Sequence, residues 1–436
     1  MKKAKFLLLA GALAMSCIML LQGCGGGGWT HKDFDFTVGD PAALSGEISV
    51  MFQQTADKRN MMTAQINKYK QRAPNVTIKP IWITNDDFYL SYLTDITTGK
   101  TFPDAAIIDH IYVQSLAAEN LIVSVSSVFE KDLYLGTVDK LGLYDGRYYG
   151  FPTTLNNMAL FYNKDIIGET PPSTWNEFKD VCAKVKSEQD LKSNPANRYY
   201  AFTQYLGSNT RLFGPTMLCS WVARHGGTLL SEDLKTSHIN TQPVIDSLSK
   251  MREISANGWA NPDTNEEGLF YEGKVGMIEI GSWIIPRVFK ASPAANFGIA
   301  PLIKMTENGS RSSVMGAYNM VVTRQKDENK MKIAADFAKF ISEDPAFQHN
   351  WAKNEMVLPV VKAALEVDDF FTGDMWEPFL AGMEGCSFRP GSPEWPYIEM
   401  ETANAISQAC NGTKTPADAA KDTSNLVQKK LNDFYS

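Results

Sequence analysis

The sequence has little cysteine, no cluster of positive charge and no apolar run long enough to span a membrane. Six of its 436 residues are cysteine, and no two have the CxxC spacing of a zinc or redox site. Lysine and arginine number 42 against 49 acidic residues without a basic run, which argues against binding nucleic acid. No HExxH or GxSxG motif is present, so the sequence has neither the zinc-binding motif of many metallohydrolases nor the nucleophile motif of many serine hydrolases. We therefore expect no metal and no cofactor.

The composition that remains is that of a soluble folded chain. Apolar residues make up 44% and charged residues 21%, and the net charge is −7. This balance excludes a disordered chain, a collagen and a polytopic membrane protein. A chain of 436 residues exceeds what one hydrophobic core usually supports, so we expect two lobes.

Residues 1–23 have the pattern of a secretory signal peptide. Three lysines precede the apolar residues 6–21, a stretch shorter than the roughly 20 residues of a membrane-spanning helix. Leu-Gln-Gly and Cys24 follow, which resembles the lipobox of bacterial lipoproteins, and four glycines then suggest a flexible tether. The resemblance implies that acyl chains on Cys24 anchor the protein outside the cytoplasm. An ordinary signal peptide with an incidental cysteine is the alternative.

Strand and helix patterns alternate from residue 46 onward. The apolar spacing predicts strands at 46–52, 76–83 and 105–108, with helices at 58–72 and 112–119. Strands joined by helices of this length form parallel units with right-handed crossovers. Further on, Trp175 and Phe178 are expected to point inward from a helix, and residues 331–341 form an amphipathic helix. The sequence therefore predicts an α/β fold.

A series of short motifs runs along the chain. They are FPD at 102–104, YDGRYYGFP at 144–152, MALFYNKD at 158–165, PPSTWNEF at 171–178, EGKVGM at 272–277 with GSW at 281–283, FGIAPL at 297–302, AADFAKFI at 334–341, LPV at 358–360 and TPADAA at 415–420. Each motif is weak alone. Together and in this order they resemble the family 1 extracellular solute-binding proteins, which are the sugar-capturing subunits of ABC importers.

This resemblance implies a two-lobed periplasmic-binding-protein-like fold of class II, similar to maltose-binding protein, with a hinge between the lobes. The expected divisions are a signal peptide at 1–23, a lipidated cysteine and flexible tether at 24–45, an N-terminal lobe from 46–151 and 317–365, and a C-terminal lobe from 152–316 and 366–436. The chain would cross between lobes near 151–153 and 314–318. The implied partners are a carbohydrate, the ABC permease subunits and a membrane reached through the lipid, without nucleic acid, and we expect a monomer.

Ligand residues are expected in loops where the two lobes face each other. By position in the resembled motifs, the candidates are Gln53, Gln54, Asp109, His110, Asn156, Glu279, Trp283, Tyr318, Asn319, Arg389 and Trp395. A sugar needs flat aromatic faces for its C–H surface, which we assign to Trp283 and Trp395. It also needs planar polar groups for its hydroxyls, which we assign to Gln54, Asp109, Asn156 and Arg389.

Each of these residues also has a purely structural alternative. Either tryptophan could belong to the core, and His110 could support a neighbour or lie at the surface. In the stretch 211–220 and just after it, Phe213, Met217 and Trp221 are all aromatic or apolar, and the sequence does not decide which one faces the ligand.

The resulting hypothesis is capture of an oligosaccharide by hinge closure, without chemistry, and its delivery to a permease. A carbohydrate-active enzyme is the rival interpretation, because carboxylates such as Asp109 and Glu279 could flank a glycosidic bond. A receptor that presents its ligand to a sensor is the third. Cysteines 182, 219, 386 and 410 could form disulfides or remain free thiols.

Overall fold

The computed structural model describes residues 34–436 apart from 54–55, 84–87, 99–102, 137, 191–198, 204–212, 262–265, 292–295 and 384–385. The predicted signal peptide, Cys24 and Gln54 therefore lie outside the described residues. Within the described part, no helix combines the length and the apolar character needed to cross a membrane.

Residues 34–44 pack onto the folded body. Phe36 is buried, its backbone N–H donates to Ser127 Oγ at 3.1 Å, and its ring stacks on Phe34 with 5.7 Å between centroids. The 3-10 helix η1 (Pro41–Ala43) follows, and its N-cap is Asp40. The prediction that the tether reaches residue 45 is therefore wrong for this stretch, because the two phenylalanines bury apolar surface against the body.

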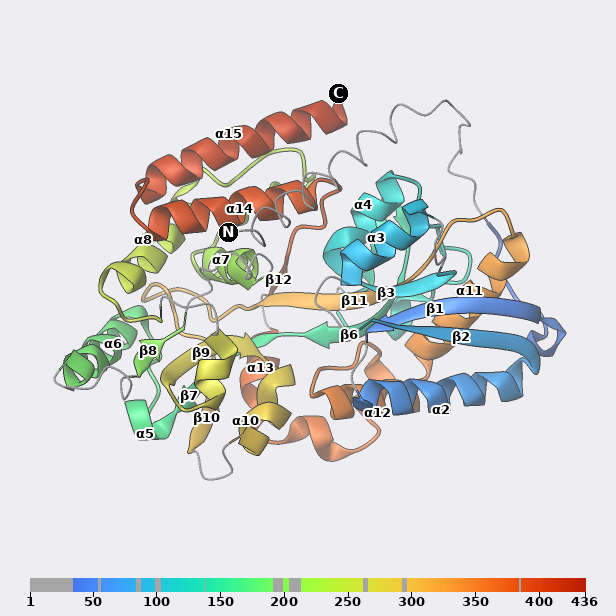
Figure 1. The fold of residues 1–436 in the computed structure, drawn as a ribbon, viewed down its shortest axis with the longest axis horizontal. Coiled ribbons are helices and arrows are strands. Elements are labelled where there is room, and N and C mark those ends of the chain that lie inside the picture. The colour runs from blue at the N-terminus through green and yellow to red at the C-terminus, as the bar shows by residue number, and fades with distance from the viewer. Residues whose placement is uncertain are drawn as a thin grey trace. The chain divides into compact units, whose positions relative to one another are not determined.

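The first sheet carries the predicted strand–helix pattern. Its strands are β1 (Ser45–Gln53), β2 (Asn75–Ile83), β3 (Ala105–Asp109), β6 (Phe151–Asn156), β11 (Val314–Val322) and β12 (Ser387–Phe388). They lie in the order β12-β11-β3-β1-β2, and β6 also pairs with β11 (Figure 1). β1 runs parallel to β2 and β3, which confirms the predicted parallel units, whereas β11 is antiparallel to β3 and β6.

Five helices accompany this sheet, and one of them supplies much of its core. They are α2 (Ala56–Arg72), α3 (Phe88–Thr98), α4 (Val113–Ala118), α11 (Glu328–Glu343) and α12 (Pro345–Glu355). Helix α11 lies against β1, β6 and β11, and its Ile333, Phe337 and Ile341 are fully buried, as its amphipathic pattern predicts. The Asp327 carboxylate accepts hydrogen bonds from the backbone of Asn329 and Lys330, which begins the helix.

The second sheet is formed by β7 (Met158–Asn163), β8 (Tyr200–Phe202), β9 (Val275–Gly281) and β10 (Phe297–Ala300), in the order β10-β7-β9-β8. Its segment of the chain also carries α5 (Lys164–Ile167), α6 (Trp175–Asp190), α7 (Phe213–Arg224), α8 (Gln242–Ala256), α9 (Glu266–Tyr271) and α10 (Ile285–Ala291). Trp175 and Phe178 of α6 are both buried, which confirms their predicted inward orientation.

The three C-terminal helices pack on the segment that carries the second sheet, the first against β7 and the other two against α8. They are α13 (Glu377–Ala381), α14 (Trp395–Cys410) and α15 (Pro416–Tyr435), and α14 lies against α7, α8 and α15 (Figure 1). The remaining short elements are η2 (His110–Tyr112), η3 (Lys131–Leu133), η4 (Val138–Gly142), η6 (Ser282–Ile284), η7 (Lys362–Ala364), η8 (Asp369–Thr372) and the hairpin of β4 (Leu143–Tyr144) and β5 (Arg147–Tyr148).

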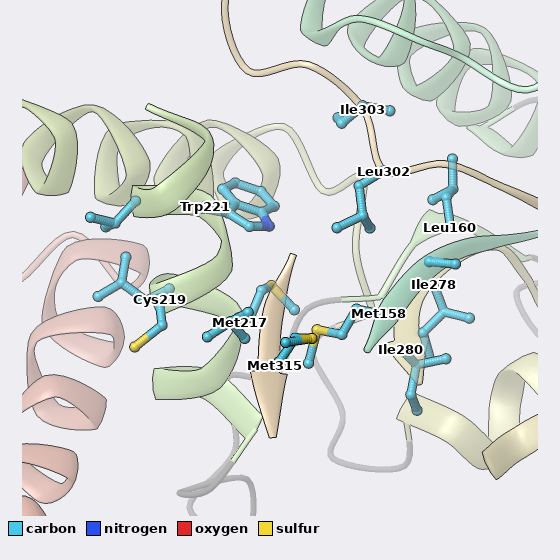
Figure 2. Packing of buried hydrophobic residues seen from close by; sticks show 14 of the residues in the cluster. Met158, Leu160, Met217, Cys219, Trp221, Ile278, Ile280, Leu302, Ile303 and Met315 are labelled. Atoms are coloured by element: carbon cyan, nitrogen blue, oxygen red, sulfur yellow. The ribbon is translucent and has the colours of Figure 1, made fainter. Parts of the chain in front are cut away.

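One residue separates a strand of the first sheet from a strand of the second. Asn157 lies between β6 and β7, is buried, and donates its side-chain amide to the backbone oxygen of Phe379. Figure 2 shows Met158 and Met315 pointing toward each other beside Met217, so three flexible thioether side chains pack where β7, β11 and α7 meet. The two sheets are thus joined at Asn157, whereas the lobe boundaries and the crossings near 151–153 and 314–318 stay predictions.

A buried ion pair occupies the core of the second sheet. The guanidinium of Arg224 donates to both carboxylate oxygens of Glu279, at 2.9 and 2.6 Å, and to the backbone oxygen of Ile303 at 3.0 Å. Trp221 adds an indole N–H bond to Glu279 at 2.8 Å. Because both charged side chains are almost completely excluded from water, the charge of each is compensated by the other and not by solvent.

We predict that Glu279→Gln destabilises the protein by about 3 to 5 kcal/mol, because it leaves Arg224 as an uncompensated buried charge. Urea unfolding followed by circular dichroism measures the change. The matched control is Glu272→Gln, which removes an exposed partner of Lys274 and should cost about 1 kcal/mol or less. Equal stability of the Glu279→Gln and parent proteins would contradict the assigned role of the pair.

Candidate functional site

Three predicted site residues converge because three strand ends meet beside the start of β11. Asp109 ends β3 and pairs with Tyr318, while Asn156 ends β6 and pairs with Gly316. β12 pairs with the first two residues of β11, and Arg389 follows it directly. The sheet register therefore brings Asp109, Asn156 and Arg389 to one edge of the first sheet.

Asp109 and Arg389 form an ion pair at this edge. One terminal nitrogen of the guanidinium lies 2.7 Å from each carboxylate oxygen, and the side chains are 12% and 7% exposed. A Cβ atom at Gly316 would lie 3.1 Å from the same nitrogen, so the glycine gives the guanidinium room beside β11. The pair joins residues that are far apart in the sequence but adjacent in the sheet.

The electrostatic environment keeps both groups charged. Burial by itself would raise the pKa of Asp109, but Arg389 and the hydrogen bond to His110 outweigh it, so this pKa lies well below its usual range. Burial would likewise lower the pKa of Arg389, and the Asp109 carboxylate raises it instead. A neutral carboxyl group at Asp109 is therefore excluded at physiological pH.

The His110 ring contacts the Asp109 carboxylate and holds it in place. Its Nδ1 lies 3.0 Å from Asp109 Oδ1 and 3.2 Å from the backbone nitrogen of Ala317, and the ring is 1% exposed. Its Nε2 is buried and has no hydrogen-bond partner within the described part of the chain. Of the alternatives that the sequence left open for His110, the structure favours the supporting role and excludes the surface.

Two tyrosines and a glutamate extend the polar cluster, and the sequence motifs did not indicate them. The Tyr112 hydroxyl donates to Glu399 Oε2 of α14 at 3.3 Å, and the Tyr89 ring stacks on Tyr112 with 3.8 Å between centroids. Burial, followed by the charges of Glu399 and Asp109, raises the pKa of Tyr112 well above its usual value. Only the fold brings α3, η2 and α14 together, so no local pattern could have predicted this contact.

Asn156 offers an unsatisfied acceptor. The residue is half-buried, and its Oδ1 is buried without a hydrogen-bond partner among the described residues. Because buried polar atoms are nearly always hydrogen-bonded, an orphaned amide oxygen beside the strand ends is suited to accept a ligand hydroxyl.

An aromatic pair lies at the end of the second sheet. Trp283 is half-buried, and a Cβ atom placed on Gly281 would lie 1.7 Å from the indole, so the ring rests directly on the glycine backbone. Gly281 pairs with Met158, two residues beyond Asn156. The Phe213 ring lies 6.4 Å from Trp283 and is also half-buried, whereas Met217 and Trp221 are buried in the core. Among the three side chains that the sequence left open, Phe213 is therefore the one that lies beside Trp283, and which of them faces a ligand stays a prediction.

Three predicted residues are buried in the core, and a fourth is half-buried. Both oxygens of Glu279 are engaged by Arg224 and Trp221, and Trp395 is 0% exposed at the start of α14, so neither offers a surface to a ligand in this structure. Asn319 is fully buried with its side chain close to Gly142 and Gly150. Tyr318 is half-buried against the core of the first sheet. Glu279, Trp395 and Asn319 are turned inward by the strand or helix that carries them, whereas Tyr318 pairs with Asp109 and its assignment stays a prediction.

Gln53 ends β1 at the same edge as Asp109, since β1 and β3 run parallel. Its amide oxygen accepts a hydrogen bond from Lys58 at 3.3 Å. Gln54 lies outside the described residues, so its assignment stays a prediction.

The four described cysteines, Cys182, Cys219, Cys386 and Cys410, are free thiols, which resolves the alternative that the sequence left open. Over the described ranges, no three histidine, cysteine, aspartate or glutamate side chains gather as metal ligands would.

Comparison with known proteins matches residues 64–375, more than half of the chain, to the family model described as bacterial extracellular solute-binding protein. The chain belongs to this family. The sequence resemblance to extracellular solute-binding proteins is thereby confirmed, and the family places its members outside the cytoplasm.

Individual relatives are distant but cover much of the chain. A protein of Brucella abortus, named only as a binding protein, is 25% identical over 87% of this chain and 92% of its own length. A maltotriose-binding protein of Pyrococcus abyssi is 22% identical over 85% of this chain and 79% of its own. An sn-glycerol-3-phosphate-binding periplasmic protein of Agrobacterium fabrum is 25% identical over 55% of each chain.

Solved structures confirm the predicted two-lobed fold. The ABC substrate-binding protein Lmo0181 of Listeria monocytogenes, in complex with cycloalternan, matches with a TM-score of 0.75 at 20% identity, over 89% of this chain and 99% of that one. The maltose/maltodextrin-binding domain MalE of Bdellovibrio bacteriovorus, bound to maltotriose, matches with a TM-score of 0.74 at 18% identity, over 89% and 100%.

We predict that Gly281→Ala displaces the Trp283 indole, because the new methyl group would occupy the space of the ring. The overlap should cost about 1 to 3 kcal/mol of unfolding free energy in urea. Gly373→Ala is the matched control, since its φ is −73° and no atom lies within 4 Å of the added carbon. If both variants unfold at the same urea concentration, the contact between Gly281 and Trp283 is not as described.

Proposed function

We propose that this protein captures a carbohydrate, specifically an oligosaccharide, by closure of its two lobes and delivers it to an ABC import permease. The observation that carries this proposal is the convergence of Asp109, Asn156 and Arg389 at one sheet edge, with Trp283 and Phe213 at the end of the adjoining sheet. Carboxylate, amide and guanidinium groups suit sugar hydroxyls, and half-buried aromatic rings suit the apolar face of a sugar.

The connection between the sheets supports the closure step. Asn156 and Met158 belong to different sheets and are separated only by Asn157, so groups on both sides of this crossing lie close along the chain. A ligand that contacts both lobes binds the closed state more tightly than the open state, and it therefore shifts the population toward closure.

We further propose that the captured ligand is released unchanged. The pair of carboxylates considered for glycoside hydrolysis is Asp109 and Glu279, and Glu279 is fully engaged in its buried ion pair. Asp109 is engaged by Arg389. The family membership supports binding over catalysis, and the names of the relatives that bind maltotriose and cycloalternan favour an oligosaccharide.

The site that we propose consists of Asp109, Asn156 and Arg389 as hydroxyl partners and of Trp283 and Phe213 as aromatic faces. His110 and Tyr112 position the charged groups behind them.

We predict that an oligosaccharide raises the melting temperature of the protein, because ligand at a hundred times its Kd adds about 2.7 kcal/mol of stability. A thermal-shift screen with monosaccharides, oligosaccharides, amino acids and polyamines identifies the ligand.

We predict that Trp283→Ala lowers the affinity of the protein for this ligand by about tenfold, the order of one aromatic contact. Isothermal titration calorimetry measures this loss.

Trp283→Phe is the matched control for this experiment and should retain most of the affinity, since it keeps an aromatic face. Unchanged affinity of Trp283→Ala would remove the residue from the site. A response to amino acids or polyamines alone, with none to sugars, would overturn the carbohydrate assignment.

We also propose that the mature protein begins at a diacylated Cys24 and acts as a monomer anchored to the membrane. The lipobox-like sequence before Cys24 and the glycines after it support this proposal.

We predict that Cys24→Ala moves the protein from the membrane fraction to the soluble fraction of the producing cell. Gly26→Ala is the control and should stay with the membrane. A Cys24→Ala protein that remains membrane-bound without acyl groups in its mass spectrum would contradict lipid anchoring.

A further inference from the structure

The charge on Arg389 is already compensated inside the protein. One terminal guanidinium nitrogen is hydrogen-bonded to both oxygens of Asp109. The positive charge of Arg389 is therefore balanced by the neighbouring Asp109 carboxylate.

Two hydrogen-bond acceptors remain available at this edge. The Asp109 carboxylate is more exposed than its partner, at 12% against 7%, and an ionised carboxylate has lone pairs beyond those used by one guanidinium nitrogen. Asn156 Oδ1 is a second acceptor, which finds no donor in the described structure. The Nε of Arg389 is also buried and has no hydrogen-bond partner among the described residues.

A hydroxyl group can donate to these acceptors, whereas a carboxylate or the dianionic phosphate group of a phosphate ester cannot. An anion would also approach the negative charge of Asp109 at short range, where the repulsion between like charges is strong. Family membership does not decide this selectivity, because one relative is named for binding sn-glycerol 3-phosphate.

We infer that the Asp109–Arg389 ion pair makes the site select uncharged polyols and reject phosphorylated and acidic ligands. This inference rests on the proposed function, since it places the pair in the ligand site. Asp109 is then a specificity-determining residue. It accepts hydrogen bonds from ligand hydroxyl groups, and it neutralises the Arg389 charge that would attract an anion.

The test measures thermal shifts of the full-length mature protein with sn-glycerol 3-phosphate, with inorganic phosphate and with maltotriose carrying one phosphate group, each beside its uncharged counterpart where one exists. The parent protein should respond to none of the anions. Asp109→Asn releases the guanidinium from its partner, so its affinity for the anions should rise by about tenfold or more. The double variant Asp109→Asn with Arg389→Gln should lose this gain.

Asp336→Asn is the matched control, because it breaks another aspartate–arginine pair, with Arg72, outside the site. It should not gain an anion response. Circular dichroism establishes that each variant is folded, and if Asp109→Asn is not, the parent's response to the anions alone decides the question.

A parent protein that binds any of the anions as tightly as the uncharged sugar would overturn the inference, as would a folded Asp109→Asn that gains no anion affinity. If no uncharged sugar shifts the melting temperature of the parent protein, this result would instead count against the proposed function. The anion gain in Asp109→Asn would still support the role of the ion pair in that case.

Discussion

The backbone pairing of β11 is the constraint on which the rest of the structure depends. This strand is antiparallel to β3 and β6 and parallel to β12, so one stretch of nine residues holds together three other segments of the chain. Its register places the ends of β3 and β6 and the residue after β12 side by side. The ion pair between Asp109 and Arg389 follows from this register and from the absence of a side chain at Gly316.

The two buried ion pairs are formed by the same types of side chain but differ in their surroundings. Arg224 and Glu279 satisfy each other within the core, together with Trp221 and a backbone carbonyl, and little capacity for a ligand remains. Asp109 and Arg389 lie at strand ends instead, where the carboxylate keeps some exposure and Asn156 adds an unsatisfied oxygen. The position of a pair relative to the end of its strand thus decides whether it stabilises the core or can also contact a ligand.

The local patterns of the sequence predicted much of the fold. Apolar alternation located β1, β2 and β3, and helical periodicity located α2 and α11, because each of these signals arises within a few neighbouring residues. The tether prediction failed for residues 34–44, where Phe34 and Phe36 find an apolar surface formed by distant segments. Trp395 was assigned to the ligand because the stretch 387–397 was interpreted as a loop, whereas α14 begins at that residue and turns the ring into the core.

The sequence by itself determined the α/β class, the family resemblance, the signal and lipobox pattern and the types of residue suited to a sugar, since all of these depend on the order of neighbouring residues. Only the tertiary structure decided that Asp109 meets Arg389, that Tyr112 meets Glu399 and that Phe213 rather than Met217 or Trp221 lies beside Trp283. These contacts join residues separated by tens to hundreds of positions. Such contacts depend on strand register and helix packing, which no local pattern of residues encodes.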